Sequence, residues 1–137
     1  MDIEKALVSH LLADQNLSAL IWDRLFPLAL PQEDSTVYPN GVVPAVVYQR
    51  ISSPRTLNLS GEDASNPRIQ FSAYALAYAQ AKQIAEVLNQ SLDYFAGTLG
   101  GRTKAQVLRV DYRDSYEQET GLYRSDVDFF VLHNKKG

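Results

Sequence analysis

Apolar and polar residues alternate near the end of the chain. Val127, Phe129 and Val131 occupy every second position and alternate with Asp126, Asp128 and Phe130. A period of two indicates a strand with one buried face and one polar face. The pattern therefore predicts a strand that has one side against a core.

Three other segments have the composition of strands. Residues 45–51 are rich in Val and Tyr, which favour strands, and residues 68–75 alternate like the final segment. A third segment, 106–112, precedes the last strand, which we place at 122–133. A short acidic and glycine-containing connection joins these two, which predicts an antiparallel hairpin.

Helical periodicity appears in two parts of the chain. Residues 77–95 carry an apolar stripe at three- and four-residue spacing, and we expect Gly97 to end this helix. A first helix is expected to begin at Asp2, and Asn16 is expected to cap a short second piece at 17–25.

The predicted order is helix, strand, strand, helix, strand, strand. It indicates an α+β fold in which two main helices pack on one face of a four-stranded, largely antiparallel sheet. The proline-rich segment 27–44 and the polar segment 52–67 are expected to be connections or arms. With 137 residues in all, we expect residues 1–137 to form a single domain.

Composition excludes several classes of function. A formal net charge of -3 argues against a general nucleic-acid binder, which would carry a basic stripe. The chain has no cysteine, so disulfides, thiolate zinc sites and cysteine nucleophiles are excluded. No apolar run approaches the roughly 20 residues that span a bilayer, so we expect no membrane partner. The acidic start is unlike a signal peptide and favours a protein made in a cytosol.

No catalytic, cofactor or metal site is predicted. The only histidines, His10 and His133, lack closely placed partners for a metal site or a triad. The glycine-rich segment 97–101 follows a helix and precedes a strand, which is the wrong order for a phosphate-binding loop. We therefore expect no catalytic residue, no cofactor and no metal.

The densest acidic cluster lies in the final strand pair. Its members are Asp111, Asp114, Glu117, Glu119, Asp126 and Asp128. Two such carboxylates across a hairpin could bind a hard cation or act as acid and base. Because several arginines lie beside them, cross-strand charge pairing on a solvated or subunit-facing surface is the simpler interpretation. A small carboxylate-dependent enzyme using Glu117, Glu119 and Asp126 is the alternative from a different class.

Several segments together resemble the tail completion, or tail terminator, family of long-tailed bacteriophages and prophages. Their order and spacing, more than any single motif, carry the resemblance. They are residues 3–8, 23–27, 44–52, 68–71 and 116–124.

The resemblance implies a structural protein and not an enzyme. Such proteins form a ring, a hexamer, on the head-proximal end of the tail tube, where it stops tube growth and joins the tail to the head. The implied partners are further copies of the chain, the tail tube protein and a head-completion or stopper protein. DNA would only pass through the ring lumen. The implied location is the tail or neck of the virion, after assembly in the cytoplasm of a bacterial host. Another head-tail connector of the neck is the alternative within this class.

A ring requires two different matching faces on each subunit. The polar side of the sheet supplies one candidate face, and the segments 27–44 and 52–67 are predicted to order only on docking. The predicted subunit or partner contacts are Arg55, Asn58, Glu62, Asp63, Arg68, Arg109, Tyr116, Glu117, Arg124, Asp126 and Asp128.

Overall fold

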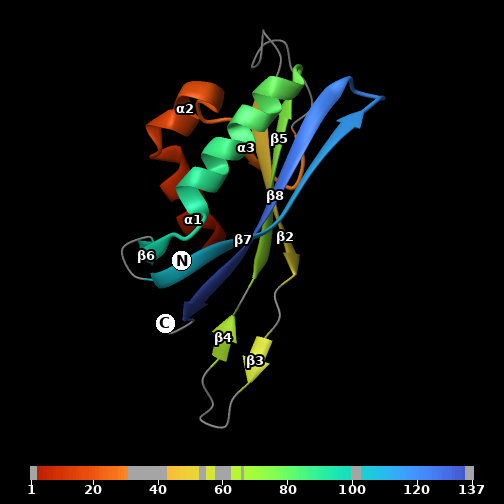
Figure 1. The fold of residues 1–137 in the computed structure, drawn as a ribbon. Helices are drawn as coiled ribbons and strands as arrows, with labels where there is room; N and C mark the ends of the chain where they lie inside the picture. The colour runs from red at the N-terminus through yellow and green to blue at the C-terminus, as the bar shows by residue number, and fades with distance from the viewer. Residues whose placement is uncertain are drawn as a thin grey trace.

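The computed structural model describes residues 3–30, 43–52, 55–57, 63–65, 67–99 and 103–134. Its helices are α1 (Ile3–Leu12), α2 (Gln15–Ile21) and α3 (Tyr78–Leu92). Its strands are β1 (Leu25–Pro27), β2 (Ala45–Ser52), β3 (Arg55–Leu57), β4 (Asp63–Ser65), β5 (Arg68–Ala75), β6 (Ala96–Leu99), β7 (Thr103–Glu117) and β8 (Leu122–Asn134). The helices form one layer and the sheet forms the other (Figure 1).

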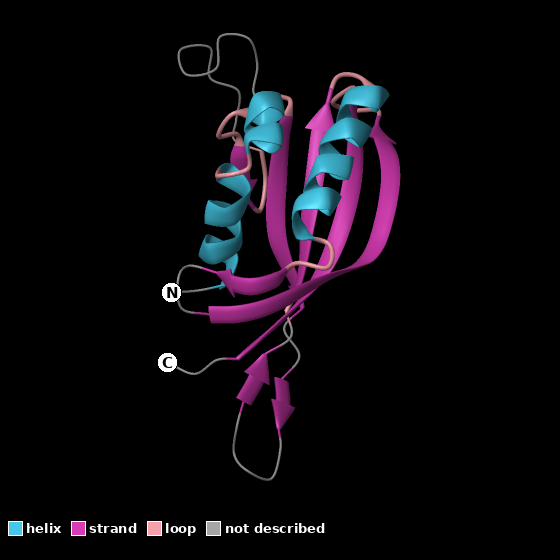
Figure 2. Ribbon diagram, turned by 60° about the vertical axis from the view of Figure 1, so that its left-hand side comes forward, coloured by secondary structure: helices cyan, strands magenta, loops and turns pink. Residues whose placement is uncertain are grey.

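One mixed, curled sheet organises the described part of the chain (Figure 2). Six strands follow the path β1-β2-β5-β8-β7-β6, and β3 and β4 form a short hairpin that joins the far end of β8. β1 runs parallel to β2, whereas the other pairings are antiparallel. β8 is therefore central, with β5 on one side and β7 on the other.

The helices cover one face of the sheet, and this face holds the core. Phe71 on β5 pairs with Val127 on β8, and the rings of Phe71 and Phe129 meet edge to face at 6.0 Å between centroids. Ile84 and Leu88 of α3 are fully buried against this surface. The strict alternation along β8 thus arises because odd-numbered residues enter the core while even-numbered residues point away from the helices.

The helix ends differ from the sequence-based expectation. Asp14, not Asn16, caps α2, since its carboxylate accepts hydrogen bonds from the backbone N–H groups of Asn16 (2.9 Å) and Leu17 (3.4 Å). α3 ends at Leu92, and the left-handed residue after it is Tyr94, with φ 60°. No helix in the described ranges is long and apolar enough to cross a membrane.

The expected fold of four strands and two helices is wrong. Leu25-Phe26-Pro27 forms a strand because Pro27 lies at the sheet edge, where its missing N–H breaks no ladder bond. Gly97 does not end a helix; it lies inside β6 and pairs with Ala105. The ends of the polar segment 52–67 pair as β3 and β4. Three- and four-residue strands are too short to show a period of two, so they could not be recognised from the sequence.

The final hairpin is also longer than expected. β7 extends through Glu117, so the segment read as a connection is mostly strand. Only residues 118–121 form the turn, which closes with a 2.9 Å hydrogen bond from the Gly121 N–H to the Glu117 carbonyl. Gly121 takes φ 71°, the left-handed position that such turns require.

Candidate functional site

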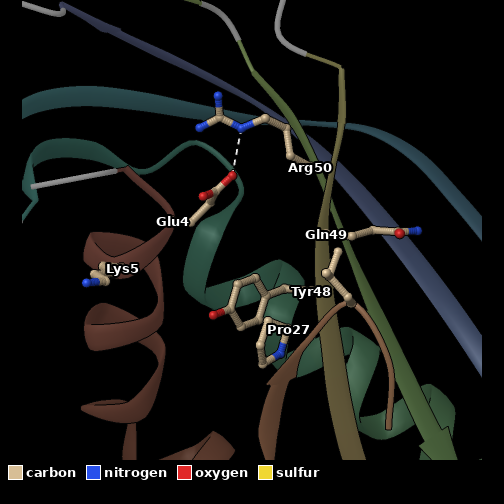
Figure 3. Close-up of a pocket in the computed structure, with 7 residues that line it drawn as sticks. Glu4, Lys5, Pro27, Tyr48, Gln49 and Arg50 are labelled. Carbon is tan, nitrogen blue, oxygen red and sulfur yellow. Dashed lines mark hydrogen bonds and ion pairs between the residues drawn. The ribbon is translucent and has the colours of Figure 1, made fainter.

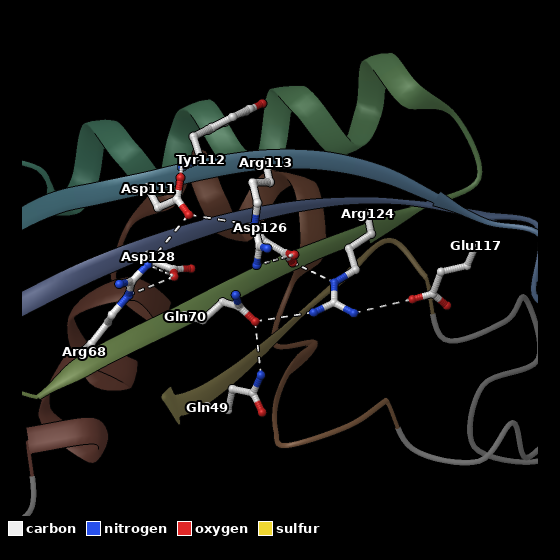
Figure 4. Close-up of polar contacts among 10 residues, drawn as sticks. All are labelled: Gln49, Arg68, Gln70, Asp111, Tyr112, Arg113, Glu117, Arg124, Asp126 and Asp128. Carbon is white, nitrogen blue, oxygen red and sulfur yellow. Dashed lines mark hydrogen bonds and ion pairs between the residues drawn. The ribbon is translucent and has the colours of Figure 1, made fainter. Parts of the chain in front are cut away.

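The sheet face that points away from the helices carries a connected group of charged side chains, which we call the polar face (Figure 4). Its described members are Gln49, Arg68, Gln70, Asp111, Arg113, Glu117, Arg124, Asp126 and Asp128. Arg68 donates to Asp128 Oδ2 from Nε at 3.1 Å and from Nη2 at 2.8 Å. Arg124 donates from Nε to Asp126 Oδ1 at 2.7 Å. These short charge-assisted bonds are the strongest links of the network.

Weaker contacts join the two strong pairs into one network. Gln70 Oε1 accepts from Arg124 at 3.4 Å and from Gln49 at 3.1 Å. Longer ion pairs, between 3.6 and 3.9 Å, are Arg124–Glu117, Arg68–Asp111, Arg113–Asp111 and Arg113–Asp126. Three arginines thus face four carboxylates, and the polar face is nearly neutral.

The two central carboxylates are buried within the subunit itself. The side chains of Asp126 and Asp128 are only 8% and 4% exposed, whereas that of Arg113 is 63% exposed. A carboxylate removed from water is costly unless a cation and hydrogen bonds compensate it. Arg124 and Arg68 supply this compensation, so the network contributes to folding of the single chain before any partner binds.

Arg124 has more partners on the polar face than any other of its described members. Burial disfavours its charged form, but the hydrogen bond and charge of Asp126 outweigh burial and raise the pKa of Arg124 above its ordinary value. The guanidinium also lies over the Tyr74 ring at 5.5 Å. This arginine is therefore held charged and fixed in orientation.

Each carboxylate of the polar face forms an ion pair with an arginine. Asp126 and Asp128 are bonded to Arg124 and Arg68, which leaves them poorly placed to bind a substrate proton. No group of three or more His, Asp or Glu side chains among the described residues is arranged to hold a metal ion. The arrangement suits structural pairing better than acid-base chemistry.

Arg109 does not belong to the polar face, and its predicted contact with a partner stays a prediction. β7 pairs with β8 at Arg109↔Phe129 and then at Asp111↔Asp128, so Val110 is an extra residue, a β-bulge. Arg109 shares the helix-facing side with Phe129, and its backbone N–H donates to Asp93 Oδ1 at 3.0 Å. The bulge reverses the alternation, a change that residue spacing alone cannot reveal.

Tyrosines gather at the distal end of the β7–β8 hairpin. Tyr116 pairs across the strands with Tyr123, with ring centroids 4.8 Å apart, and Tyr78 at the start of α3 lies 5.9 Å from Tyr123. Tyr116 is 51% exposed. Exposed aromatic rings are enriched in protein interfaces, so Tyr116 stays a candidate contact.

A polar cluster beside these tyrosines was not anticipated. Asp114 accepts from the Ser125 hydroxyl at 2.7 Å and from the Tyr78 hydroxyl at 3.0 Å. Burial acts to raise the pKa of Asp114, but hydrogen bonds, first that of Ser125 and then that of Tyr78, lower it below its ordinary value. Asp114 and Ser125 face each other across the hairpin, so the pairing register could have suggested their contact. Tyr78 is 36 residues away from Asp114, and nothing in the sequence indicated that the two meet.

Apolar side chains occupy the other end of the uncovered sheet face. Leu108 pairs with Phe130, and Leu132 pairs with Gln106, on the side that continues the polar face. Leu108 and Leu132 are exposed, and Phe130 is half-buried. The uncovered face is therefore charged towards the hairpin turn and apolar towards the C-terminal end of β8.

A pocket of about 330 Å³ lies where β1 and β2 meet the start of α1 (Figure 3). It is lined by Glu4, Lys5, Pro27, Leu28, Tyr48, Gln49 and Arg50. The Arg50 Nε donates to Glu4 Oε1 at 2.6 Å across it. Its volume is at the lower limit for small-molecule sites, and Glu4 and Arg50 pair with each other, so it offers no evident chemistry.

Two of the remaining predicted contacts lie in the β3–β4 hairpin. Arg55 begins β3 and pairs with Ser65, and Asp63 begins β4 and pairs with Leu57. Only their backbones are described. Asn58 and Glu62 lie outside the described residues.

Comparison with known proteins identifies the family. The profile described as "Tail completion protein gp17" matches residues 5–134. The chain belongs to this family. Tail completion proteins are structural proteins of the bacteriophage virion, and this places the chain in the tail or neck of a virion.

A solved structure has the same fold as this tail completion protein. A chain of the "Virion of native gene transfer agent (GTA) particle" superimposes with a TM-score of 0.73 and 16% sequence identity, covering 96% of this chain and 94% of that chain. No curated protein sequence matches significantly.

Proposed function

We propose that this tail completion protein forms a closed ring, a hexamer, on the head-proximal end of the tail tube. There the ring ends tube growth and joins the tail to the head. The observation that carries the proposal is the family match, which spans nearly the whole chain and not a short motif. Its partners would be further copies of the chain, the tube protein and a head-completion protein, with DNA passing only through the lumen.

The geometry of the sheet supports head-to-tail contacts of the kind that build rings. β1 lies at one end of the strand path, and β6 and β7 lie at the other, so opposite sides of the subunit present different surfaces. A closed ring needs two such unlike, complementary surfaces, whereas a two-fold dimer needs one self-complementary surface.

We assign the polar face to a subunit or partner contact. Its central carboxylates are already neutralised, so a partner need not compensate buried charge, and the exposed Arg113 remains available at its rim. Tyr116, on the other side of the same hairpin, is also exposed. Charged rims fix the register and orientation of an interface more than they add affinity. Glu117 and Arg124 would link this rim to the buried pairs.

The family description names the tail, which favours a ring on the tail tube over a connector on the head side. The experiment measures the mass of the purified protein and images it by electron microscopy, alone and with tail tubes. We expect rings that cap one end of each tube. A strictly monomeric protein that leaves tube ends uncapped and tube length unregulated would refute the proposal.

A further inference from the structure

Each non-glycine residue with positive φ in the described part of the chain has a large side chain exposed to solvent. These residues are Trp22, Leu28 and Tyr94, with φ of 58°, 68° and 60°. Their exposed fractions of 71%, 74% and 81% are the highest among the large hydrophobic residues of that part. Positive φ is unfavourable for a residue with a Cβ, and an apolar side chain left in water adds little to stability. Retained strain of this kind indicates a function.

Trp22 lies in the turn that leads into β1. Its φ of 58° and ψ of -114° are those of the first central residue of a type II′ turn, where glycine is the usual residue. The turn closes with a hydrogen bond from the Arg24 N–H to the Ile21 carbonyl at 3.0 Å. Arg24 Cζ also lies over the Trp22 ring, 5.6 Å from its centroid. The indole is thus presented at the surface with a cation beside it.

Leu28 lies in the turn that follows β1. The Ala29 N–H donates to the Pro27 carbonyl at 2.8 Å, which closes a three-residue turn around Leu28. With positive φ at Leu28, this is the rare and strained form of the γ-turn. Leu28 lines the pocket of Figure 3 together with Pro27 and Tyr48. Because Pro27 has no N–H and its carbonyl is bonded, this edge can bind a partner through side chains and not by adding a strand.

Both ends of β1 therefore present an apolar side chain at the cost of strain. We call residues 22–28 and the residues that line the pocket the β1 surface. Tyr94 lies at the end of α3, whereas Trp22 and Leu28 bracket the same strand. Two such residues around one edge strand indicate that the β1 surface binds an apolar partner.

A second exposed apolar group lies on the β7–β8 hairpin, at the other side of the sheet from β1. The Tyr78 and Tyr116 rings both contact the Tyr123 ring, at centroid distances of 5.9 and 4.8 Å. Tyr78, Tyr116 and the neighbouring Leu76 are exposed. We call these four residues the tyrosine cluster. Because the rings already restrict each other, a partner that covers them loses little side-chain entropy.

The two surfaces have opposite charge balances. Residues 114–123 contain three carboxylates and no Lys or Arg, and Lys82 and Arg124 offset two of these carboxylates. The β1 surface carries three cations and two carboxylates, which are Lys5, Arg24, Arg50, Glu4 and Asp23. Opposite balances favour contact between unlike surfaces over contact between two copies of the same surface.

We propose that the β1 surface of one subunit binds the tyrosine cluster of a second copy. The inference rests on the proposed ring, to which it gives a specific head-to-tail contact. Trp22 and Leu28 pack against the tyrosine rings of the second copy, and the pocket of about 330 Å³ beside Leu28 accepts one of these rings. The strained turns are retained because the interface uses the side chains that they present.

Glycine substitutions separate binding from folding. Trp22→Gly/Leu28→Gly removes both apolar side chains and relieves both turns, so the melting temperature should not fall. This variant should need at least about tenfold more protein to cap half of the tail tubes, because a few buried side chains dominate an interface. Ala29→Gly adds flexibility beside Leu28 but removes only a methyl group, so it should cap tubes like the wild type. Unchanged capping by the double variant, or an equal loss in Ala29→Gly, would overturn the inference.

A change on the other surface tests the same contact. Tyr116→Ser should also raise the concentration for half-capping about tenfold. When this chain is mixed with Trp22→Gly/Leu28→Gly, each supplies the surface that the other lacks, so every second contact in a ring is intact. The mixture should cap tubes at about threefold less total protein than either variant alone, because half of the contacts are restored. A mixture no better than its components would overturn the head-to-tail pairing.

The outcomes separate this inference from the proposed function. Normal capping by both variants overturns the inference and leaves the ring in place, whereas wild-type protein that neither forms rings nor caps tubes overturns both. A two-fold contact through Trp22 would be weakened by the glycine variant and not by Tyr116→Ser, which would overturn the inference. Glycine-variant rings that form normally but leave tubes uncapped would assign the β1 surface to the tube protein and would also overturn it.

Discussion

Replacing Arg68 with methionine measures how much the buried part of the polar face contributes to folding. The change keeps most of the aliphatic length but removes both N–H groups that bond Asp128 at 3.1 and 2.8 Å. Asp128, whose side chain is 4% exposed, would be left without these two hydrogen-bond donors.

The magnitude follows from the exposure of the two partners. Removing one partner from a fully buried ion pair costs roughly 3–5 kcal/mol. The Arg68 side chain is 32% exposed, so water can partly replace it, and we expect a loss of about 2 kcal/mol in the free energy of unfolding. For a chain of this size such a loss lowers the melting temperature by roughly 5–8 °C.

The assay is urea unfolding followed by linear extrapolation to water. Arg113→Met is the matched control, because Arg113 is 63% exposed and its ion pairs of 3.8 and 3.9 Å exceed hydrogen-bonding distance. It should change stability by less than about 0.5 kcal/mol. In the double variant Arg68→Met/Asp128→Leu, about half of the lost stability should return, since no unpaired charge remains.

Two results would refute this reasoning. One is an Arg68→Met protein as stable as the Arg113→Met control, which would mean that water compensates Asp128 in spite of its burial. The other is a double variant whose destabilisation equals the sum of the two single changes, because coupled partners must deviate from additivity.

Three further predictions concern other parts of the chain. Ser125→Ala should raise the pKa of Asp114 towards its ordinary value in an NMR titration. Because the wild-type pKa is lowered, the ionised Asp114 stabilises the fold at pH values above the ordinary pKa of 3.8. That stabilisation is lost as the pH falls through the lowered pKa. An unchanged titration would contradict the hydrogen bond. Tyr94→Gly should stabilise the protein by up to about 1 kcal/mol in urea, since Tyr94 is 81% exposed at φ 60°; a loss above that size would show that the ring makes an important contact. Replacing residues 58–62 by Asn-Gly, a two-residue turn that can keep β3 and β4 paired, should preserve the melting temperature but reduce tail joining in an infectivity assay. Normal joining would remove residues 58–62 from the interface.

The elements that sequence predicted well are those whose periodicity is enforced by the core. Val127 and Phe129 alternate with carboxylates because β8 is central and long, and Ile84 and Leu88 repeat along α3 because one side of that helix is buried. A long helix or strand places several residues in the core, so its repeating pattern of apolar residues can be distinguished from a chance arrangement.

The strands that could not be predicted from the sequence are held by hydrogen bonds to neighbouring strands and show no alternating pattern of apolar residues. β1 contains a proline and β6 contains a glycine, so both have compositions typical of loops, and neighbouring strands alone determine their conformation. Likewise, the polar face includes Asp126 and Asp128 as predicted but excludes Arg109, because one bulge shifts the register.

That bulge also constrains how related chains can differ in length. Deleting Val110 would remove the bulge and leave a regular strand, because Arg109 would still pair with Phe129 and Asp111 with Asp128, so every later residue of β7 would keep its side of the sheet. Deleting any other single residue of β7 would instead turn the residues on one side of the deletion to the opposite face. An insertion in the turn at 118–121 has no such effect, because both strands would keep their partners. An alignment of this family should therefore place gaps in the turn or at Val110 and nowhere else between Thr103 and Glu117. A relative that has neither the bulge nor a gap at this position should show hydrophobic and charged residues exchanged over one half of the strand.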